Sequence, residues 1–117
     1  MAERELKPVV LENGQCPFDA WFESLRDKKM QHAVDSRLTR MRAGNFGDHE
    51  PVGSGVFELR LDIGPGLRIY YGEQDKKIVI LLGGGDKRSQ SRDINRAIQL
   101  WEQLKEIRKH ASKKLQK

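Results

Sequence analysis

The chain has 117 residues, of which 37% are hydrophobic and 33% charged, and its formal net charge at pH 7 is +5. This length predicts one domain, and the grouping of the apolar residues excludes a disordered chain. A single cysteine, Cys16, excludes an internal disulfide. No stretch resembles a signal peptide or approaches the roughly 18 apolar residues of a membrane-spanning helix, so we expect a cytoplasmic protein with no membrane partner.

The positive charge is concentrated near the C-terminus. Residues 105–117 contain one acidic residue, Glu106, against six basic residues: Lys105, Arg108, Lys109, Lys113, Lys114 and Lys117. Acidic and basic residues balance in the rest of the chain. We therefore divide the chain into a domain over residues 1–109 and a basic tail over 110–117, which is either a solvated end or an auxiliary contact to phosphates.

The N-terminal half predicts one strand and two helices. Residues 5–11 are typical of a strand, and Pro8 favours an edge position in the sheet. Pro17 suits the first turn of a short helix, and Asp27 suits the cap of a second helix that ends at Gly44. The apolar face of the second helix comprises Met30, Ala33, Val34, Leu38 and Met41. Its basic face, predicted to be solvated, comprises Lys28, Lys29, Arg37, Arg40 and Arg42.

The C-terminal half predicts three strands and a helix. Residues 44–55 are rich in glycine and are predicted to be a loop, in which His49 is either a catalytic base or simply exposed. Strands are expected at about 56–62, 67–73 and 77–82, and the short turns between them imply an antiparallel meander. The third strand is apolar on both faces, which predicts a central or helix-covered position. A glycine-rich turn then leads to a helix that begins near Ser89 or Ser91 and whose apolar stripe, widened by Leu100 and Ile107, favours cover on two sides.

These elements predict an α+β fold with the order β-α-α-β-β-β-α. The sheet is small and mainly antiparallel. One of its faces packs on the helical hairpin, and the chain ends in a C-terminal helix. The three histidines lack the spacing of metal ligands, so neither a metal nor another cofactor is expected.

The other face of the predicted sheet carries the candidate site. Period-two alternation places Glu58, Arg60, Arg68 and Tyr70 on it. Guanidinium groups hold phosphate oxygens, so the face is either an anion-binding surface or a structural network of ion pairs. In the second case Arg60 pairs with Glu58 or with a carboxylate on a neighbouring strand, and Arg68 pairs with Glu58 or Asp62.

Further candidates follow the last strand. Lys87 and Arg88 would lie beside the positive end of the final helix, where phosphates bind well. The full set of candidate site residues is Arg60, Arg68, Lys87, Arg88, Gln90 and Asp93. Gln90 and Asp93 are interpreted as groups that orient the reacting atoms, since no obvious proton-transfer pair accompanies the cations.

An ordered set of short motifs over residues 5–105 resembles the RelE/ParE superfamily of bacterial toxins, and within it the HigB-like addiction module killer proteins. The motifs are Phe18-Asp19 with Trp21-Phe22, residues 44–48, residues 53–56, Glu58-Leu59-Arg60, residues 64–71, and residues 84–87 with Ser89, Gln90, Asp93 and Ile94. The resemblance implies a RelE-like fold. It also matches Arg68 to the arginine of the family's strand motif, Arg60 to a basic residue on the preceding strand, and Lys87 and Arg88 to the basic pair after the last strand.

The resemblance further implies a function. Such a chain is the toxin of a type II toxin-antitoxin pair, and we expect a metal-independent endoribonuclease that cuts mRNA on the ribosome and stops translation. Its expected partners are ribosome-bound mRNA and a cognate antitoxin, typically a small helix-turn-helix protein. It is expected to contact DNA only indirectly, through this antitoxin. ParE-like relatives instead inhibit DNA gyrase, and an inactive binding module is the third reading. Glu58 stands where RelE-like nucleases have a lysine, and no tyrosine lies near Asp93.

Overall fold

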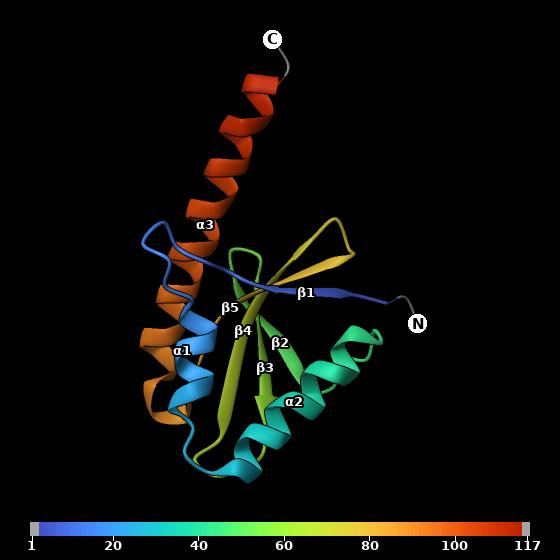
Figure 1. Cartoon of the computed structure of the whole chain (residues 1–117), viewed down its shortest axis with the longest axis vertical. Helices are drawn as coiled ribbons and strands as arrows, with labels where there is room; N and C mark the ends of the chain where they lie inside the picture. The colour runs from blue at the N-terminus through green and yellow to red at the C-terminus, as the bar shows by residue number, and fades with distance from the viewer. Residues whose placement is uncertain (1–2, 116–117) are drawn as a thin grey trace.

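The computed structural model describes residues 3–115 and consists of one five-stranded sheet and three α-helices. The elements, in chain order, are β1 (Glu5–Pro8), α1 (Pro17–Ser24), α2 (Lys28–Arg42), β2 (His49–Gly53), β3 (Val56–Leu61), β4 (Leu67–Gln74), β5 (Ile78–Asp86), the 3-10 turn η1 (Lys87–Ser89) and α3 (Gln90–Leu115) (Figure 1). The strand order is β1-β5-β4-β3-β2, and only the β1–β5 pair is parallel. The predicted α+β class and mainly antiparallel sheet are confirmed.

The edges of the sheet hold one confirmed prediction and one error. β1 is an edge strand, as Pro8 indicates. The segment predicted as a loop over 44–55, however, contains β2, which pairs with β3 at the opposite edge. The prediction was wrong because glycine and proline are typical of loops. Proline is also tolerated in an edge strand, where its missing N–H is not needed for pairing, and Pro51 lies in such a strand. The register shifts between Pro51 and Gly53, so the strand is irregular as well as short.

The last strand is longer than predicted, because the glycine-rich segment belongs to it rather than to a turn. β5 runs to Asp86 between β1 and β4, which confirms its central position. Two of its glycines allow helices to approach from both faces. A Cβ at Gly84 would lie 2.3 Å from the ring of Trp21 on α1, and one at Gly85 would collide with the carboxylate of Asp93 on α3. Side chains at these two positions would push the helices off the sheet.

Each face of the sheet has its own hydrophobic core. The larger core lies under α1 and α2 and is built from Phe18, Val34, Leu38, Met41, Leu59, Leu61, Leu67, Ile69, Tyr71, Val79 and Leu81. The smaller core lies under the first half of α3 and is built from Val56, Tyr70, Leu82, Ala97 and Trp101. The helical hairpin therefore covers one face, as predicted. α3 covers only part of the other, which leaves the ends of β3 and β4 near Arg60 and Arg68 open.

The outer half of α3 projects beyond the sheet (Figure 1). Ile107 is 59% exposed, so the predicted cover on two sides is wrong at this residue. The helix continues to Leu115, and the predicted tail over 110–117 is thus helical as far as the structure describes it. Residues 116–117 of that tail lie outside the described residues. Within residues 3–115, no helix combines the length and apolarity needed to cross a membrane.

Candidate functional site

Arg60 and Arg68 lie directly opposite each other on β3 and β4. Like charges at opposed positions of two strands repel, so each guanidinium requires a carboxylate partner or a bound anion. The structure supplies carboxylates to both. The described residues of this sheet face therefore form ion pairs, one of the two predicted alternatives, and each arginine has its own set of partners.

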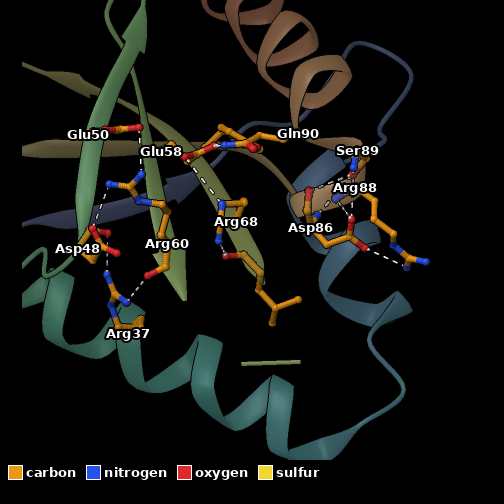
Figure 2. A network of polar contacts seen from close by, with 12 residues as sticks. Arg37, Asp48, Glu50, Glu58, Arg60, Arg68, Asp86, Arg88, Ser89 and Gln90 are labelled. Carbon is orange, nitrogen blue, oxygen red and sulfur yellow. Dashed lines mark hydrogen bonds and ion pairs between the residues drawn. The ribbon is translucent and has the colours of Figure 1, made fainter. Parts of the chain in front are cut away.

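The first set, which we call the inner cluster, consists of Glu58, Arg68, Tyr70 and Gln90. Glu58 is fully buried, and its Oε2 accepts hydrogen bonds from the Tyr70 hydroxyl at 3.1 Å and from Gln90 Nε2 at 2.8 Å. Its Oε1 lies 3.8 Å from Nε of Arg68, whose side chain is 12% exposed (Figure 2). A buried carboxylate is costly unless it is paired and hydrogen-bonded, so this cluster fixes Arg68 and the start of α3 together.

Tyr70 serves the inner cluster as a neutral hydrogen-bond donor. Burial, followed by the neighbouring charge of Glu58, raises the pKa of its phenol well above the ordinary value of 10.0. Its side chain is 1% exposed. The Tyr70 hydroxyl is therefore engaged inside the protein, where it donates to Glu58.

The second set, the outer cluster, consists of Arg60, Asp48 and Glu50. Arg60 donates to Glu50 Oε1 at 3.0 Å and to Asp48 Oδ1 at 3.2 Å, and all three side chains are partly exposed. Burial acts against the charge of Arg60, but the two carboxylates outweigh it and raise the pKa of the guanidinium. The partner is thus a carboxylate on a neighbouring strand, one of the predicted alternatives.

Arg37 of α2 supports the outer cluster from below. It donates to the backbone carbonyls of Arg60 at 2.6 Å and Asp48 at 3.2 Å (Figure 2). It also donates to the backbone carbonyl of Phe46 at 3.0 Å. Gly47 allows this approach, because a Cβ there would lie 2.9 Å from the guanidinium of Arg37. The sequence analysis placed Arg37 on a solvated helix face. No local pattern in the sequence predicted its hydrogen bonds to the backbone next to the start of β2.

A hollow of about 440 Å³ joins the two arginines to Lys87. We call it the cation hollow, and it is lined by Asp48, Arg60, Leu61, Asp62, Gly64, Pro65, Gly66, Arg68 and Lys87. Gly66 has a φ of +82°, and a Cβ there would lie 3.5 Å from Cβ of Lys87 and 3.6 Å from Nη1 of Arg68. The glycine-proline-glycine turn thus brings backbone close to two of the three cations.

Lys87 differs from the two arginines in being free to bind a ligand. It is exposed, and among residues 3–115 it forms no ion pair. Arg60 and Arg68 each retain a buried Nε without a hydrogen-bond partner in the described part of the chain. The hollow therefore offers one unpaired ammonium and two guanidinium groups whose carboxylate contacts are incomplete.

The other three predicted residues lie outside the cation hollow. Arg88 is 84% exposed and pairs with Asp86 at 3.4 Å, beside a separate hollow. Gln90 is bound to Glu58 in the inner cluster. Asp93 accepts a hydrogen bond from Ser89 Oγ and packs against Gly85. The structure thus brings together three of the six residues and gives Gln90 and Asp93 contacts within the protein.

A carboxylate caps the 3-10 turn η1, which leads into the final helix. Asp86 accepts from the backbone N–H groups of Arg88 at 2.8 Å and Ser89 at 3.3 Å. Slight burial opposes its charge, but these hydrogen bonds and the Arg88 side chain prevail and lower the pKa of Asp86 below 3.8. The helix terminus expected to receive a phosphate is therefore already capped by the protein itself.

The comparison with known proteins assigns the chain to a family. A protein from Haemophilus influenzae (strain ATCC 51907 / DSM 11121 / KW20 / Rd), described as an uncharacterized protein, is 42% identical over 87 residues, which cover 74% of this chain and 88% of the relative. The chain belongs to the same family as this Haemophilus influenzae protein. No family model matches the chain. No solved structure matches it either.

In this member of the family, the cation hollow can bind an anion but holds few groups for proton transfer. Glu58 and Tyr70 are buried, whereas the carboxylates of Asp48 and Asp62 line the hollow and are exposed. His49 is exposed nearby on β2, with its Nδ1 2.8 Å from the carbonyl oxygen of Gly47. Within residues 3–115, no three histidine, cysteine or acidic side chains are grouped so that they could hold a metal ion.

Proposed function

We propose that this chain is the toxin of a type II toxin-antitoxin pair and that it cuts mRNA on the ribosome. The observation that carries the proposal is the cation hollow, in which Arg60, Arg68 and Lys87 meet beside a glycine-rich turn. The motifs that resemble the RelE/ParE toxins supply these same three residues. The expected antitoxin is a small helix-turn-helix protein, through which the toxin contacts DNA only indirectly.

The chemistry follows from the charges of the hollow. A phosphodiester of RNA would lie against Lys87 and displace part of the carboxylate contacts of Arg60, because guanidinium groups bind phosphate oxygens in a bidentate manner. Attack by the 2′-hydroxyl on phosphorus would form a 2′,3′-cyclic phosphate and break the bond to the 5′-oxygen of the next nucleotide, with water taking up the hydroxyl proton and protonating the leaving oxygen. The extra negative charge on the phosphate during this step would be stabilised by the three cations of the hollow. The ribosome would supply the orientation of the substrate, since the hollow lacks a complete acid–base pair.

Induced expression of the wild-type chain in bacteria tests this proposal. We expect growth arrest together with mRNA 5′ ends that appear inside translated codons and keep the phase of the reading frame. The purified protein should cut mRNA on translating ribosomes and leave the same naked RNA intact. Growth arrest with intact mRNA would refute the nuclease assignment, and efficient cutting of naked RNA would refute the dependence on the ribosome.

One observation favours a second candidate, a protein that inhibits DNA gyrase or acts only as a binding module. Both arginines of the hollow already have carboxylate partners, which a surface used only for docking tolerates better than a catalytic site does. Under this reading, induction would produce DNA damage or no arrest, while mRNA stays intact. The same 5′-end mapping, combined with a gyrase supercoiling assay, separates the two candidates.

A further inference from the structure

A second feature of the surface lies away from the cation hollow, where the segment after β1 meets the outer side of α3. We call it the apolar groove, and it is lined by Val10, Leu11, Glu12, Asn13, Gln99, Leu100, Glu102, Gln103, Leu104, Glu106 and Ile107. Among the described residues, the two large hydrophobic side chains that are exposed are Val10, at 64%, and Ile107, at 59%. Both line this groove. Contiguous exposed apolar surface with a polar rim is typical of a protein interaction site.

The charge of the apolar groove is opposite to that of the chain. Three glutamates, Glu12, Glu102 and Glu106, lie around it, and the described residues that line it include no lysine or arginine. The whole chain nevertheless carries a net charge of +5. A surface of this kind attracts cations around an apolar centre and repels acidic partners.

The shape of the groove suits a helix. Leu100, Leu104 and Ile107 follow one another at helical spacing along α3, and such a row forms the ridge against which a second helix packs. The outer half of α3 also projects beyond the sheet (Figure 1). Since most helical stability in proteins comes from tertiary packing, an added helix here would stabilise α3.

We propose that the apolar groove binds an amphipathic helix of a partner protein whose apolar stripe is flanked by lysine or arginine. The apolar stripe would cover Val10 and Ile107, and the flanking cations would lie near the three glutamates. A second copy of this chain docked symmetrically through the same groove would bring its own three glutamates against these three, so charge complementarity favours a cationic helix of another protein. The proposal does not depend on the toxin assignment.

Two synthetic peptides of about 18 residues test the proposal with the full chain. Both carry leucines at helical spacing. The first has lysines beside the leucines, and the second has glutamates at the same positions. Fluorescence anisotropy of the labelled peptides measures the affinity of each for the wild-type protein. We expect the lysine peptide to bind at least about tenfold more tightly than the glutamate peptide.

Three variants assign that preference to the groove. Glu102→Lys combined with Glu106→Lys should reverse it, so that the glutamate peptide binds more tightly. A matched reversal outside the groove, Glu23→Lys with Asp35→Lys, changes the net charge equally and should leave the preference in place. Ile107→Asn should weaken both peptides. All five side chains are exposed, so the variants should fold, and circular dichroism checks this.

Three results would overturn the proposal. The first is an equal shift of preference in the matched control variant, which would show a response to net charge alone. The second is unchanged binding in Ile107→Asn. The third is a dimer of the wild-type chain in analytical ultracentrifugation that Ile107→Asn converts to a monomer, which would assign the groove to a second copy.

Discussion

The inner and outer clusters place the same two kinds of side chain, arginine and carboxylate, on adjacent strands but at different depths. Arg68 is 12% exposed and faces the fully buried Glu58, whereas Arg60 is 31% exposed and faces Asp48 and Glu50, which are 64% and 50% exposed. Exposed ion pairs contribute little to stability, whereas the loss of one partner from a buried pair leaves an uncompensated charge. Depth, rather than residue type, therefore decides which arginine holds the fold together.

This difference also separates structure from function within the cation hollow. Arg68 is tied to the core through Glu58, so its removal affects both the fold and any bound ligand. The Arg60 side chain pairs with Asp48, just before β2, and with Glu50 on this edge strand. Lys87 has no ion pair in the described residues and is the cation whose removal reports on function alone.

The largest effect is expected for Arg68→Ala. This variant leaves the buried carboxyl group of Glu58 without its ionic partner, so the free energy of unfolding should fall by about 3–5 kcal/mol. Urea denaturation followed by circular dichroism measures the change. A loss below about 1 kcal/mol would place this pair in the same class as exposed ion pairs.

Glu58→Ala should cost less, about 2 kcal/mol. It leaves Tyr70 and Gln90 without their acceptor, but Arg68 lines the cation hollow and can turn toward water. The same denaturation experiment compares the two variants. A larger loss of unfolding free energy in Glu58→Ala than in Arg68→Ala would mean that the Arg68 side chain cannot turn toward water. The cation hollow would then be more closed than described.

Asp86 extends the comparison to a carboxylate held mainly by backbone N–H groups. Asp86→Ala removes the cap of η1 and should cost about 1 kcal/mol at pH 7. The pKa of Asp86 is lowered in the folded state, so its ionised form contributes stability above its ordinary pKa of 3.8. This contribution is lost as the pH falls through the lower, folded-state pKa. Unfolding curves of the variant and the wild type should thus converge at acidic pH, and a constant difference down to pH about 2 would contradict the assignment.

Among the variants of ion-paired residues, the smallest effect is expected for Arg60→Ala. Its two ion pairs are exposed, so the loss in unfolding free energy should stay within about 1 kcal/mol and shrink as salt is added. Thermal unfolding at low and high salt measures both properties. A larger loss that does not respond to salt would mean that the outer cluster is as closely built as the inner one.

Periodicity predicted the helices and located four of the five strands. Two of them, β3 and β4, were predicted at nearly their observed bounds, whereas β1 ends earlier and β5 ends later than predicted. The edge position of β1 followed from Pro8. Periodicity could not predict β2, because Pro51 and the surrounding glycines are read as a loop unless the neighbouring strand is known. That omission hid Asp48 and Glu50 as the partners of Arg60. The contact between Gln90 and Glu58 joins residues 32 positions apart and depends on how α3 lies on the sheet, which no local pattern encodes. Ile107 was predicted to be covered because its spacing fits the core stripe, although α3 has already left the sheet at that residue.

The most direct test of the proposed function compares Lys87→Ala with Lys28→Ala, which removes an exposed lysine from α2. Both variants should keep the unfolding free energy of the wild type to within about 0.5 kcal/mol, since both side chains are exposed. Growth arrest after induction should be lost in Lys87→Ala and retained in Lys28→Ala at equal soluble protein levels. Full growth arrest by Lys87→Ala would contradict the assignment of the cation hollow as the functional site.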